Sequence, residues 1–209
     1  MLQQTQRSKD WYEIRKGKFT ASRISELLGA KGLGKTGETY IFEMACEIAF
    51  GIDETGEKFV SKDMQRGIDL EPLAFRKFKE LKEFDFLEVK PSYFFSYGKD
   101  AGSSPDGLVG DDAVLEIKCP RPQKFFNLLA FGKDAIDPIY YDQMQMQMLC
   151  SNSVRCHFFN YVIFNGKEMW KEIIVERDEK RIELIKTRLD EAIKIRNEYV
   201  EYLLKENDF

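Results

Sequence analysis

The order of hydrophobic periodicities along the chain constrains its fold more than any other feature. Apolar residues recur at helical spacing in three early segments, 20–28, 40–50 and 62–82. From Leu87 the spacing becomes that of strands, predicted at 86–89, 93–97, 107–109 and 114–119. Two helices are predicted next, over 125–131 and 140–149. They are followed by a hairpin over 157–175 that turns at Asn165-Gly166, and by a long amphipathic helix over 178–205. This order predicts one α/β domain over residues 1–209, with helices around a central mixed β-sheet and a long C-terminal helix.

Three local signals add detail to the first helices. Thr20 is predicted to cap the helix over 20–28, and a glycine-rich loop is predicted over 29–37. Pro72 is expected in the first turn of its helix or at a break within it, because proline removes a backbone hydrogen bond.

The charge of the chain is unevenly distributed. Its 209 residues carry 32 Lys or Arg and 36 Asp or Glu, so the formal net charge is −4, which argues mildly against nucleic-acid binding. The first 35 residues hold eight basic and three acidic side chains, and this +5 segment forms either a local surface for anions or a solvated charged face.

No apolar run is long enough to cross a membrane, and the first residues lack the apolar core of a signal peptide. We therefore expect a cytoplasmic protein with no membrane partner.

Cysteine and histidine usage narrows the chemistry. Cys46, Cys119, Cys150 and Cys156 form no CxxC pair, and the chain has one histidine, His157. A zinc site built from Cys150, Cys156 and His157 would have poor spacing, so reduced buried thiols are favoured. A single histidine also disfavours Ser-His-Asp and Cys-His catalysis. Catalysis should therefore depend on carboxylates, lysine, or a hard metal ion with oxygen ligands.

Residues 29–36 match the phosphate-binding pattern GxxxxGK[ST] letter for letter. Such a loop must leave a buried strand and enter a helix so that its N–H groups surround phosphate. The residues before it, Ser22–Leu28, have helical periodicity instead. The segment is either a nucleotide site that uses Lys35 and Thr36 or a flexible loop between helices. Because no strand is predicted before it, the flexible loop is favoured.

A second constellation places acids and a base together. Asp106 precedes one predicted strand, and Glu116 and Lys118 lie on the next. Alternation along a strand puts Glu116 and Lys118 on one face, with the Ile117 carbonyl between them. If Asp106 begins the partner strand of a hairpin, its carboxylate lies beside Glu116. Two carboxylates, a carbonyl and waters suit Mg²⁺ or Mn²⁺. The alternative is a turn aspartate with a cross-strand Glu–Lys ion pair.

A third pattern alternates glutamine with methionine over residues 143–148. In a helix Gln143 and Gln147 share one face, and Met144 and Met148 share another. One reading is a core-packing methionine face with solvated glutamines. The other directs a glutamine at the metal site.

Taken together, the motifs resemble the PD-(D/E)XK nuclease superfamily and, more narrowly, the phage lambda exonuclease and YqaJ-like viral recombinase family. The resemblance runs from Trp11 to Phe159. It rests on five motifs in order, which are WYEIRKGKFTAS at 11–22, GIDLEP at 67–72, SPDG at 104–107, EIKCP at 116–120 and Gln143.

This resemblance implies a restriction-endonuclease-like fold and a metal-dependent nuclease. It implies 5′→3′ digestion of one strand of double-stranded DNA from a 5′-phosphorylated end, which leaves 3′ overhangs for recombination. It also implies Mg²⁺ or Mn²⁺ as cofactor, a homotrimer ring around DNA, and a single-strand annealing protein as partner.

The resemblance also assigns roles to residues of this sequence. Asp106, Glu116 and the Ile117 carbonyl would bind the metal, and Glu71 would support it. Lys118 would orient or deprotonate the attacking water, with Gln143 holding Lys118 or the scissile phosphate. The remaining residues would contact DNA or its 5′-phosphate, namely Arg15, Ser22, Ser104, Trp11, Lys124 and Arg121. Lys124 stands where the family has an arginine, so it loses the bidentate fork, and Arg121 is a nearby substitute.

Three alternatives stay open at the level of the sequence. One is another PD-(D/E)XK enzyme, Cas4-like or structure-specific, although the four cysteines have unsuitable spacing for an iron–sulfur cluster. Another is a P-loop nucleotide-binding protein. The third is a non-catalytic DNA-binding module, which the intact Asp106, Glu116 and Lys118 set argues against.

Overall fold

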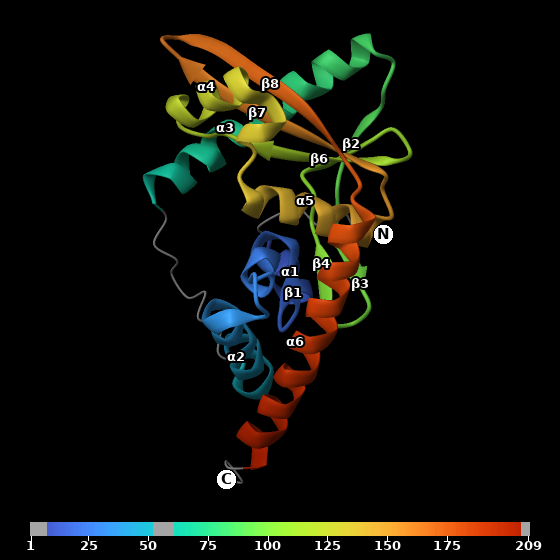
Figure 1. Ribbon diagram of the computed structural model, residues 1–209. Coiled ribbons are helices and arrows are strands. Elements are labelled where there is room, and N and C mark those ends of the chain that lie inside the picture. Colours follow the sequence, from blue (N-terminus) through green and yellow to red (C-terminus); the bar gives the residue numbers. More distant parts are fainter. Residues whose placement is uncertain (1–7, 52–60, 206–209) are drawn as a thin grey trace.

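A five-stranded mixed sheet forms the upper half of the molecule in a computed structural model that describes residues 8–51 and 61–205 (Figure 1). Its strands run in the order β2-β5-β6-β7-β8, with β6 and β7 parallel and the other neighbours antiparallel. Their bounds are β2 Val89–Pro91, β5 Gly107–Val109, β6 Ala113–Lys118, β7 Arg155–Phe164 and β8 Lys167–Glu176. The predicted central mixed sheet is confirmed.

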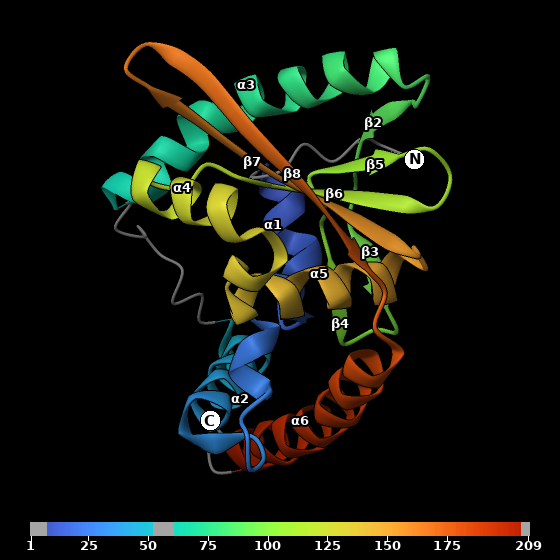
Figure 2. The ribbon, with the colours of Figure 1, turned by 45° about the horizontal axis from the view of Figure 1, so that its top comes forward.

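Helices cover both faces of this sheet (Figure 2). On one face α3 (Lys62–Phe84) packs Ala74 and Phe78 against Leu115 and Ile117 of β6. The other face is covered by α4 (Pro122–Phe131) and α5 (Pro138–Ser151), which are joined by the 3₁₀ helix η2 (Gly132–Ala135). The alternation along β6 thus divides its side chains between two helical layers.

A second, smaller unit of structure lies below α5. It contains α1 (Lys9–Arg15), the 3₁₀ helix η1 (Ala21–Leu27), α2 (Gly34–Phe50) and the long α6 (Glu179–Lys205). A three-stranded sheet in the order β1-β4-β3 joins them, with bounds β1 Phe19–Thr20, β4 Ala101–Ser103 and β3 Phe95–Tyr97. Their shared core includes Phe19, Ile41 and Leu189, together with Met146 from α5.

Helix α5 is buried on several sides at once. Met144 and Met148 pack into the core below the main sheet, while Met146 belongs to the core of the lower unit. Gln145 and Gln147 are 0% and 1% exposed, so the reading of solvated glutamines was wrong. Because this part of α5 lies between two cores, Gln145 and Gln147 have no access to solvent, whereas Gln143 is half-buried.

Several predicted bounds were wrong. The helix expected from Tyr40 begins at Gly34, within the predicted loop. The helix predicted over 20–28 is the 3₁₀ helix η1, and Thr20 precedes it without a side-chain cap. Strands β1 and β4 were missed because two or three residues carry no detectable alternation. The strand expected over 86–89 lies at Val89–Pro91, since Phe86 has a left-handed backbone with φ 57°.

Pro72 neither begins nor breaks its helix. It lies inside α3, which runs unbroken from Lys62 to Phe84, and its ring is on the exposed side. The carbonyl that Pro72 leaves without a helical donor can therefore be hydrated, which makes an internal proline tolerable.

The hairpin turn and the long C-terminal helix are as predicted. Asn165 and Gly166 have φ angles of 50° and 72°, the left-handed values of a two-residue hairpin turn that asparagine and glycine tolerate. Within the described residues, no helix is both long and apolar enough to cross a membrane.

Candidate active site

The two predicted metal-binding carboxylates come together where β5 and β6 pair. The Asp106 N–H donates to the Leu115 carbonyl at 2.9 Å, so Asp106 bonds to β6 directly before β5 begins at Gly107. The Asp106 carboxylate accepts a hydrogen bond from the Ile117 N–H at 2.6 Å. Glu116, between these two residues of β6, is 2% exposed. The hairpin therefore brings the Asp106 carboxylate to the strand that carries Glu116.

Lys118 lies on the same face of β6 as Glu116. Its ammonium donates to Oε1 of Glu116, and it lies 4.8 Å from the centre of the Tyr140 ring. Leu115 and Ile117 belong instead to the core under α3. The predicted separation of charged and apolar side chains along this strand is therefore observed.

Helix α5 contributes two glutamines to the same carboxylate. Gln143 Nε2 donates to Glu116 Oε1 at 2.7 Å, and its Oε1 lies 3.5 Å from Lys118 Nζ. Gln147 Nε2 donates to Glu116 Oε2 at 2.6 Å. Gln147 was not assigned to the site from the sequence. The signal that could have found it is its position one turn after Gln143 on the same helix face.

Burial and the charges of this cluster shift the pKa values of Asp106 and Lys118. Burial, and then the neighbouring charge of Glu116, raise the pKa of Asp106 well above its ordinary value of 3.8. Burial alone would lower the pKa of Lys118, but the Glu116 and Asp106 carboxylates outweigh it and raise that pKa above the ordinary value of 10.5. The site therefore holds excess negative charge that a cation would neutralise.

One cavity of about 240 Å³ joins these groups to the N-terminal segment. It is lined by Asp106, Glu116, Lys118 and both glutamines, together with Glu71. The side chains expected to hold a phosphate or DNA line it as well, namely Trp11, Arg15, Ser22 and Ser104. The structure therefore brings together residues from α1, η1, the turn before β5, α3, β6 and α5.

The side chains at the far wall of this cavity contact one another. Trp11 Nε1 donates to Ser104 Oγ at 3.1 Å, and the Arg15 guanidinium lies 4.0 Å above the Trp11 ring. Arg15 also reaches Ser22 Oγ at 3.5 Å. Stacking on an aromatic ring leaves guanidinium N–H groups for a further acceptor. Two hydroxyls and a guanidinium form a surface of donors that suits a phosphate.

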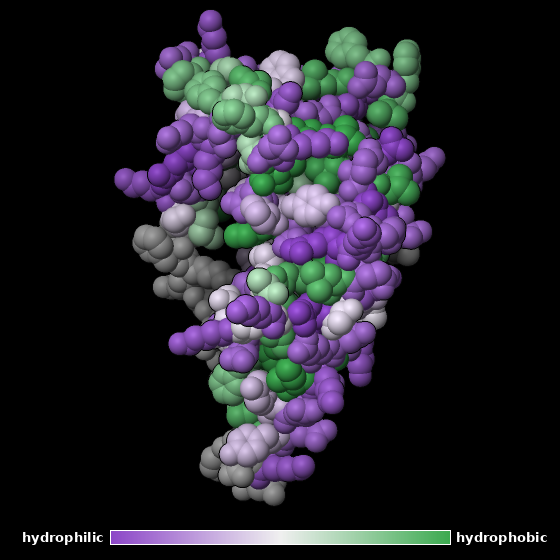
Figure 3. All heavy atoms as spheres, viewed as in Figure 1, coloured by the Kyte–Doolittle hydropathy of each residue, from purple (hydrophilic) through white to green (hydrophobic). Residues whose placement is uncertain are grey.

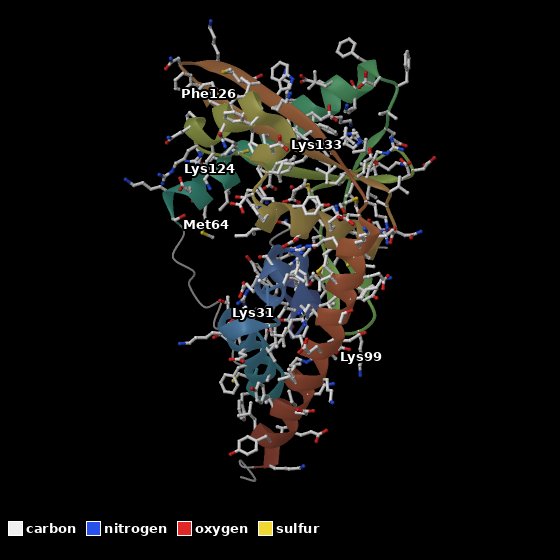
Figure 4. All side chains as sticks on the ribbon, viewed as in Figure 1. Lys31, Met64, Lys99, Lys124, Phe126 and Lys133 are labelled. Atoms are coloured by element: carbon white, nitrogen blue, oxygen red, sulfur yellow. The ribbon has the colours of Figure 1, made fainter. Side chains whose placement is uncertain are left out.

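Lys124 and Arg121 lie outside this cavity. Both line a neighbouring cavity of about 490 Å³ that also contacts Lys118 and Tyr140. A third cavity, of about 250 Å³, is lined by Glu71, Lys118 and Met64 and so links the other two. Figure 4 labels Lys124 and Met64 on one side of the molecule and Lys99 on the other. The exposed Arg121 is already bound to Asp63, with contacts of 2.7 and 2.6 Å.

The oxygen groups present fit a hard divalent cation. In residues 8–51 and 61–205, no cluster of three or more His, Cys, Asp or Glu side chains forms a closed metal site. The two carboxylates of Asp106 and Glu116, the Ile117 carbonyl and waters would leave positions open for substrate, as Mg²⁺ sites do. Burial and the neighbouring Glu116 charge raise the pKa of Asp106, and a bound cation would favour its ionised form.

Two other candidate sites do not form. The glycine-rich loop at 29–36 follows a 3₁₀ helix and not a strand, and Lys35 is exposed. A P-loop therefore lacks its structural context. Cys156 packs in the core under α5. His157 instead packs against Phe78 of α3, and its Nδ1 lies 2.5 Å from Glu172 Oε1. These two residues point to opposite faces of β7 and cannot share a zinc ion.

Comparison with known proteins finds a matching family and similar solved structures. The model of the YqaJ-like viral recombinase domain matches residues 10–153. Alkaline exonuclease LHK-Exo from Laribacter hongkongensis is 29% identical, with 95% of this chain and 97% of that chain covered and a TM-score of 0.81. A complex of LHK-Exo with dAMP matches at 27% identity over the same shares, with a TM-score of 0.79.

A phage-related exonuclease from Haemophilus somnus 129PT shares the fold. It is 19% identical over 90% of this chain and 96% of that chain, with a TM-score of 0.67. No curated protein sequence gives a significant match. The similarity to exonucleases supports a nuclease activity and confirms the predicted restriction-endonuclease-like architecture. Because the family model covers well over half of the residues, this chain belongs to the YqaJ-like viral recombinase family.

Proposed function

We propose that the protein is a metal-dependent exonuclease that degrades one strand of linear double-stranded DNA in the 5′→3′ direction. It would start at a 5′-phosphorylated end and leave 3′ overhangs for recombination by single-strand annealing. One observation carries this proposal. The cavity of about 240 Å³ joins the Asp106, Glu116 and Lys118 cluster to the donor groups of Arg15, Ser22 and Ser104.

Within this cavity the acids and Lys118 have separate tasks. Asp106, Glu116 and the Ile117 carbonyl would hold Mg²⁺ or Mn²⁺, with Glu71 beside them. A divalent ion held there would polarise the phosphate and lower the pKa of the attacking water. Because the carboxylates raise the pKa of Lys118, its ammonium is suited to orient that water and to stabilise phosphate charge. Gln143 would hold Lys118 in this position through the 3.5 Å contact.

Directionality would come from the opposite wall of the cavity. A terminal 5′-phosphate bound by Arg15, Ser22 and Ser104 would place the next phosphodiester bond toward Asp106 and Glu116. LHK-Exo has been crystallised with dAMP, a deoxynucleoside monophosphate, which is consistent with a site for a nucleotide end in a relative. Trp11 would orient Ser104 through its indole N–H.

Cleavage of linear duplex DNA tests the activity. We expect release of mononucleotides that requires Mg²⁺ and is faster from a 5′-phosphorylated end than from a 5′-hydroxyl end. Lys118→Ala should reduce the rate by at least about 100-fold, the usual scale for a lost acid–base or charge-stabilising group. Lys99→Ala removes an exposed lysine on the far side of the molecule and should leave the rate unchanged.

The same assay separates this enzyme from other nucleases. Equal attack on closed circular DNA would favour an endonuclease of the same superfamily, and Mg²⁺-independent or absent cleavage would refute the proposal. Arg15→Ala should reduce the preference for a 5′-phosphate while cleavage of 5′-hydroxyl ends changes little. An unchanged preference would remove Arg15 from the phosphate pocket.

We also propose a homotrimer ring around DNA and an annealing protein as partner. Large apolar side chains stay exposed on α4 and at the hairpin of β7 and β8, which supports contacts with other chains (Figure 3). They are Leu129, Phe131, Ile163, Phe164 and Trp170. Light scattering would measure three times the 24.5 kDa chain mass for the trimer. A monomer at micromolar concentration would contradict the ring.

A further inference from the structure

We infer that Gln147 is a positioning residue for the cation site, which it serves by holding one oxygen of Glu116. This inference rests on the proposed metal-dependent function and adds a residue to it. Gln147 does not need to touch substrate or cation. It would act by fixing the direction in which the Glu116 carboxylate points.

The contacts of Glu116 are divided between its two oxygens. Oε1 receives hydrogen bonds from Lys118 and, at 2.7 Å, from Gln143 Nε2. Oε2 receives a hydrogen bond from Gln147 Nε2 at 2.6 Å. Gln143 and Gln147 are one helical turn apart on α5, so a single helix face bonds both oxygens. Without Gln147, the remaining donors would act on Oε1 alone and turn the carboxylate toward Lys118.

The backbone that carries Gln147 is held firmly. Met144 and Met148 are buried in the core below the main sheet, and Met146 is buried in the core of the lower unit. The residue itself is 1% exposed and lines the cavity. A side chain fixed in this way can hold a ligand carboxylate in one orientation, as groups behind metal ligands do.

The geometry of Gln147 is not the one that stability alone would select. Its Oε1 is buried and has no hydrogen-bond partner among the residues that the structure describes. An unsatisfied buried acceptor destabilises the folded state. Gln145, on the same helix, differs in this respect. Its Nε2 donates to the Glu176 carbonyl at 3.0 Å, and its Oε1 accepts from the Asp178 N–H at 2.8 Å. Gln145 therefore ties α5 to β8 and to the residue before α6, whereas the hydrogen bond of Gln147 goes to the proposed site.

Mn²⁺ alone is the probe for the test, read as the rise in melting temperature during a titration of the full chain. Gln147→Met keeps the size of the side chain and matches its methionine neighbours. We expect its melting temperature without metal to fall, because Glu116 Oε2 loses its donor, but by less than in Gln145→Met, because Gln147 Oε1 has no hydrogen bond to lose among the described residues. The Mn²⁺ concentration that gives half of the rise should increase by about 10- to 100-fold, the usual loss when a group behind a metal ligand is removed.

Gln145→Met is the matched control. It should lower the melting temperature without metal, because it breaks two satisfied hydrogen bonds, and it should leave the Mn²⁺ midpoint unchanged. Gln147→Leu provides a second variant if Gln147→Met does not fold.

The outcomes separate the two levels of the proposal. An unmodified protein whose melting temperature does not respond to Mn²⁺ would overturn the metal-dependent function and this inference with it. A normal response in the unmodified protein with an unchanged midpoint in the Gln147 variants would overturn only the role of Gln147. A loss of metal-free stability in Gln147→Met equal to that in Gln145→Met, with an unchanged midpoint, would show that Gln147 is structural.

Discussion

At the residue scale, the molecule surrounds one buried carboxylate with hydrogen-bond donors. Glu116 is 2% exposed, and Lys118, Gln143 and Gln147 all donate to it. A buried charge is tolerable only with such partners. Burial, and then the repulsion of Glu116 beside it, raise the pKa of Asp106. Stability and function conflict at this pair, as is common in active sites.

The variant Asp106→Asn should make the metal-free protein more stable at neutral pH. A carboxyl group whose pKa is higher in the folded than in the unfolded state destabilises the fold once pH exceeds its ordinary value of 3.8. We expect a gain in unfolding free energy of about 1–2 kcal/mol at pH 7, a typical effect of relieving active-site repulsion.

Urea unfolding between pH 4 and pH 8 measures this effect. The advantage of Asp106→Asn should shrink toward pH 4, because the carboxyl group is then increasingly protonated in both states. The variant should also lose the Mn²⁺-induced rise in melting temperature. A constant advantage at all pH values would mean that repulsion with Glu116 is not its cause.

At the element scale, a buried polar cluster holds α3 to the sheet on the face away from the site. Lys82 of α3 is 7% exposed and donates to Glu172 of β8 at 2.9 Å. His157 of β7 contacts the other oxygen of Glu172 at 2.5 Å and packs on Phe78. The one histidine is thus part of a structural cluster, and the proposed chemistry does not use it.

Lys82→Ala should weaken the attachment of α3. Burial alone would raise the pKa of Glu172, but the hydrogen bonds of His157 and Lys82 outweigh it and lower that pKa. A lowered carboxyl pKa stabilises the fold above the ordinary value of 4.5 and loses this effect as pH falls through the folded value. Breaking a buried pair of this kind costs about 2–4 kcal/mol at pH 7.

Chemical denaturation at pH 7 and pH 4 checks this prediction. The loss in Lys82→Ala should be smaller at pH 4 than at pH 7. Lys77→Ala, which removes a lysine bound to Glu80 near the surface of the same helix, should cost clearly less. Equal losses in the two variants would contradict a special role for the buried pair.

At the scale of the whole molecule, the net charge of −4 conceals how basic groups are placed. Arg23, within the basic N-terminal segment, is bound to Glu26 and Glu43 at 2.7 and 2.8 Å. Arg15 instead faces the cavity, and Lys118 and Lys124 line the neighbouring one. Arg15, Lys118 and Lys124 thus place positive groups at the site and beside it.

Lys124 should contribute more to DNA binding than Arg121, because Asp63 already neutralises Arg121. Duplex DNA binding measured by fluorescence anisotropy without divalent metal tests this expectation. Lys124→Ala should weaken affinity and lower the slope of log K against log salt concentration by about 1, the value for one phosphate contact.

Lys99→Ala is the control in this measurement and should leave both affinity and slope unchanged. A larger effect of Arg121→Ala than of Lys124→Ala would mean that DNA displaces Asp63, and that Arg121 takes the place of the family arginine.

Local pattern determined much of this protein. Alternation along residues 113–118 separates the charged from the apolar side chains of β6, and the Asn165-Gly166 turn specifies the hairpin, because both depend on neighbours in the chain. The five motifs in their order were sufficient to identify the family. Helix bounds at Gly34 and the short strands β1 and β4 were not predictable, since too few residues carry their signal.

Only the tertiary structure decided the surroundings of α5 and the shape of the cavity. A helix buried between two cores has no polar stripe, so its sequence does not show which glutamine faces which partner. Gln145 and Gln147 look alike in the sequence, yet Gln145 bonds β8 and the residue before α6, whereas Gln147 bonds Glu116. The cavity likewise needs α1, η1, β6 and α5 to meet, and contacts between distant segments are set by packing and not by local periodicity.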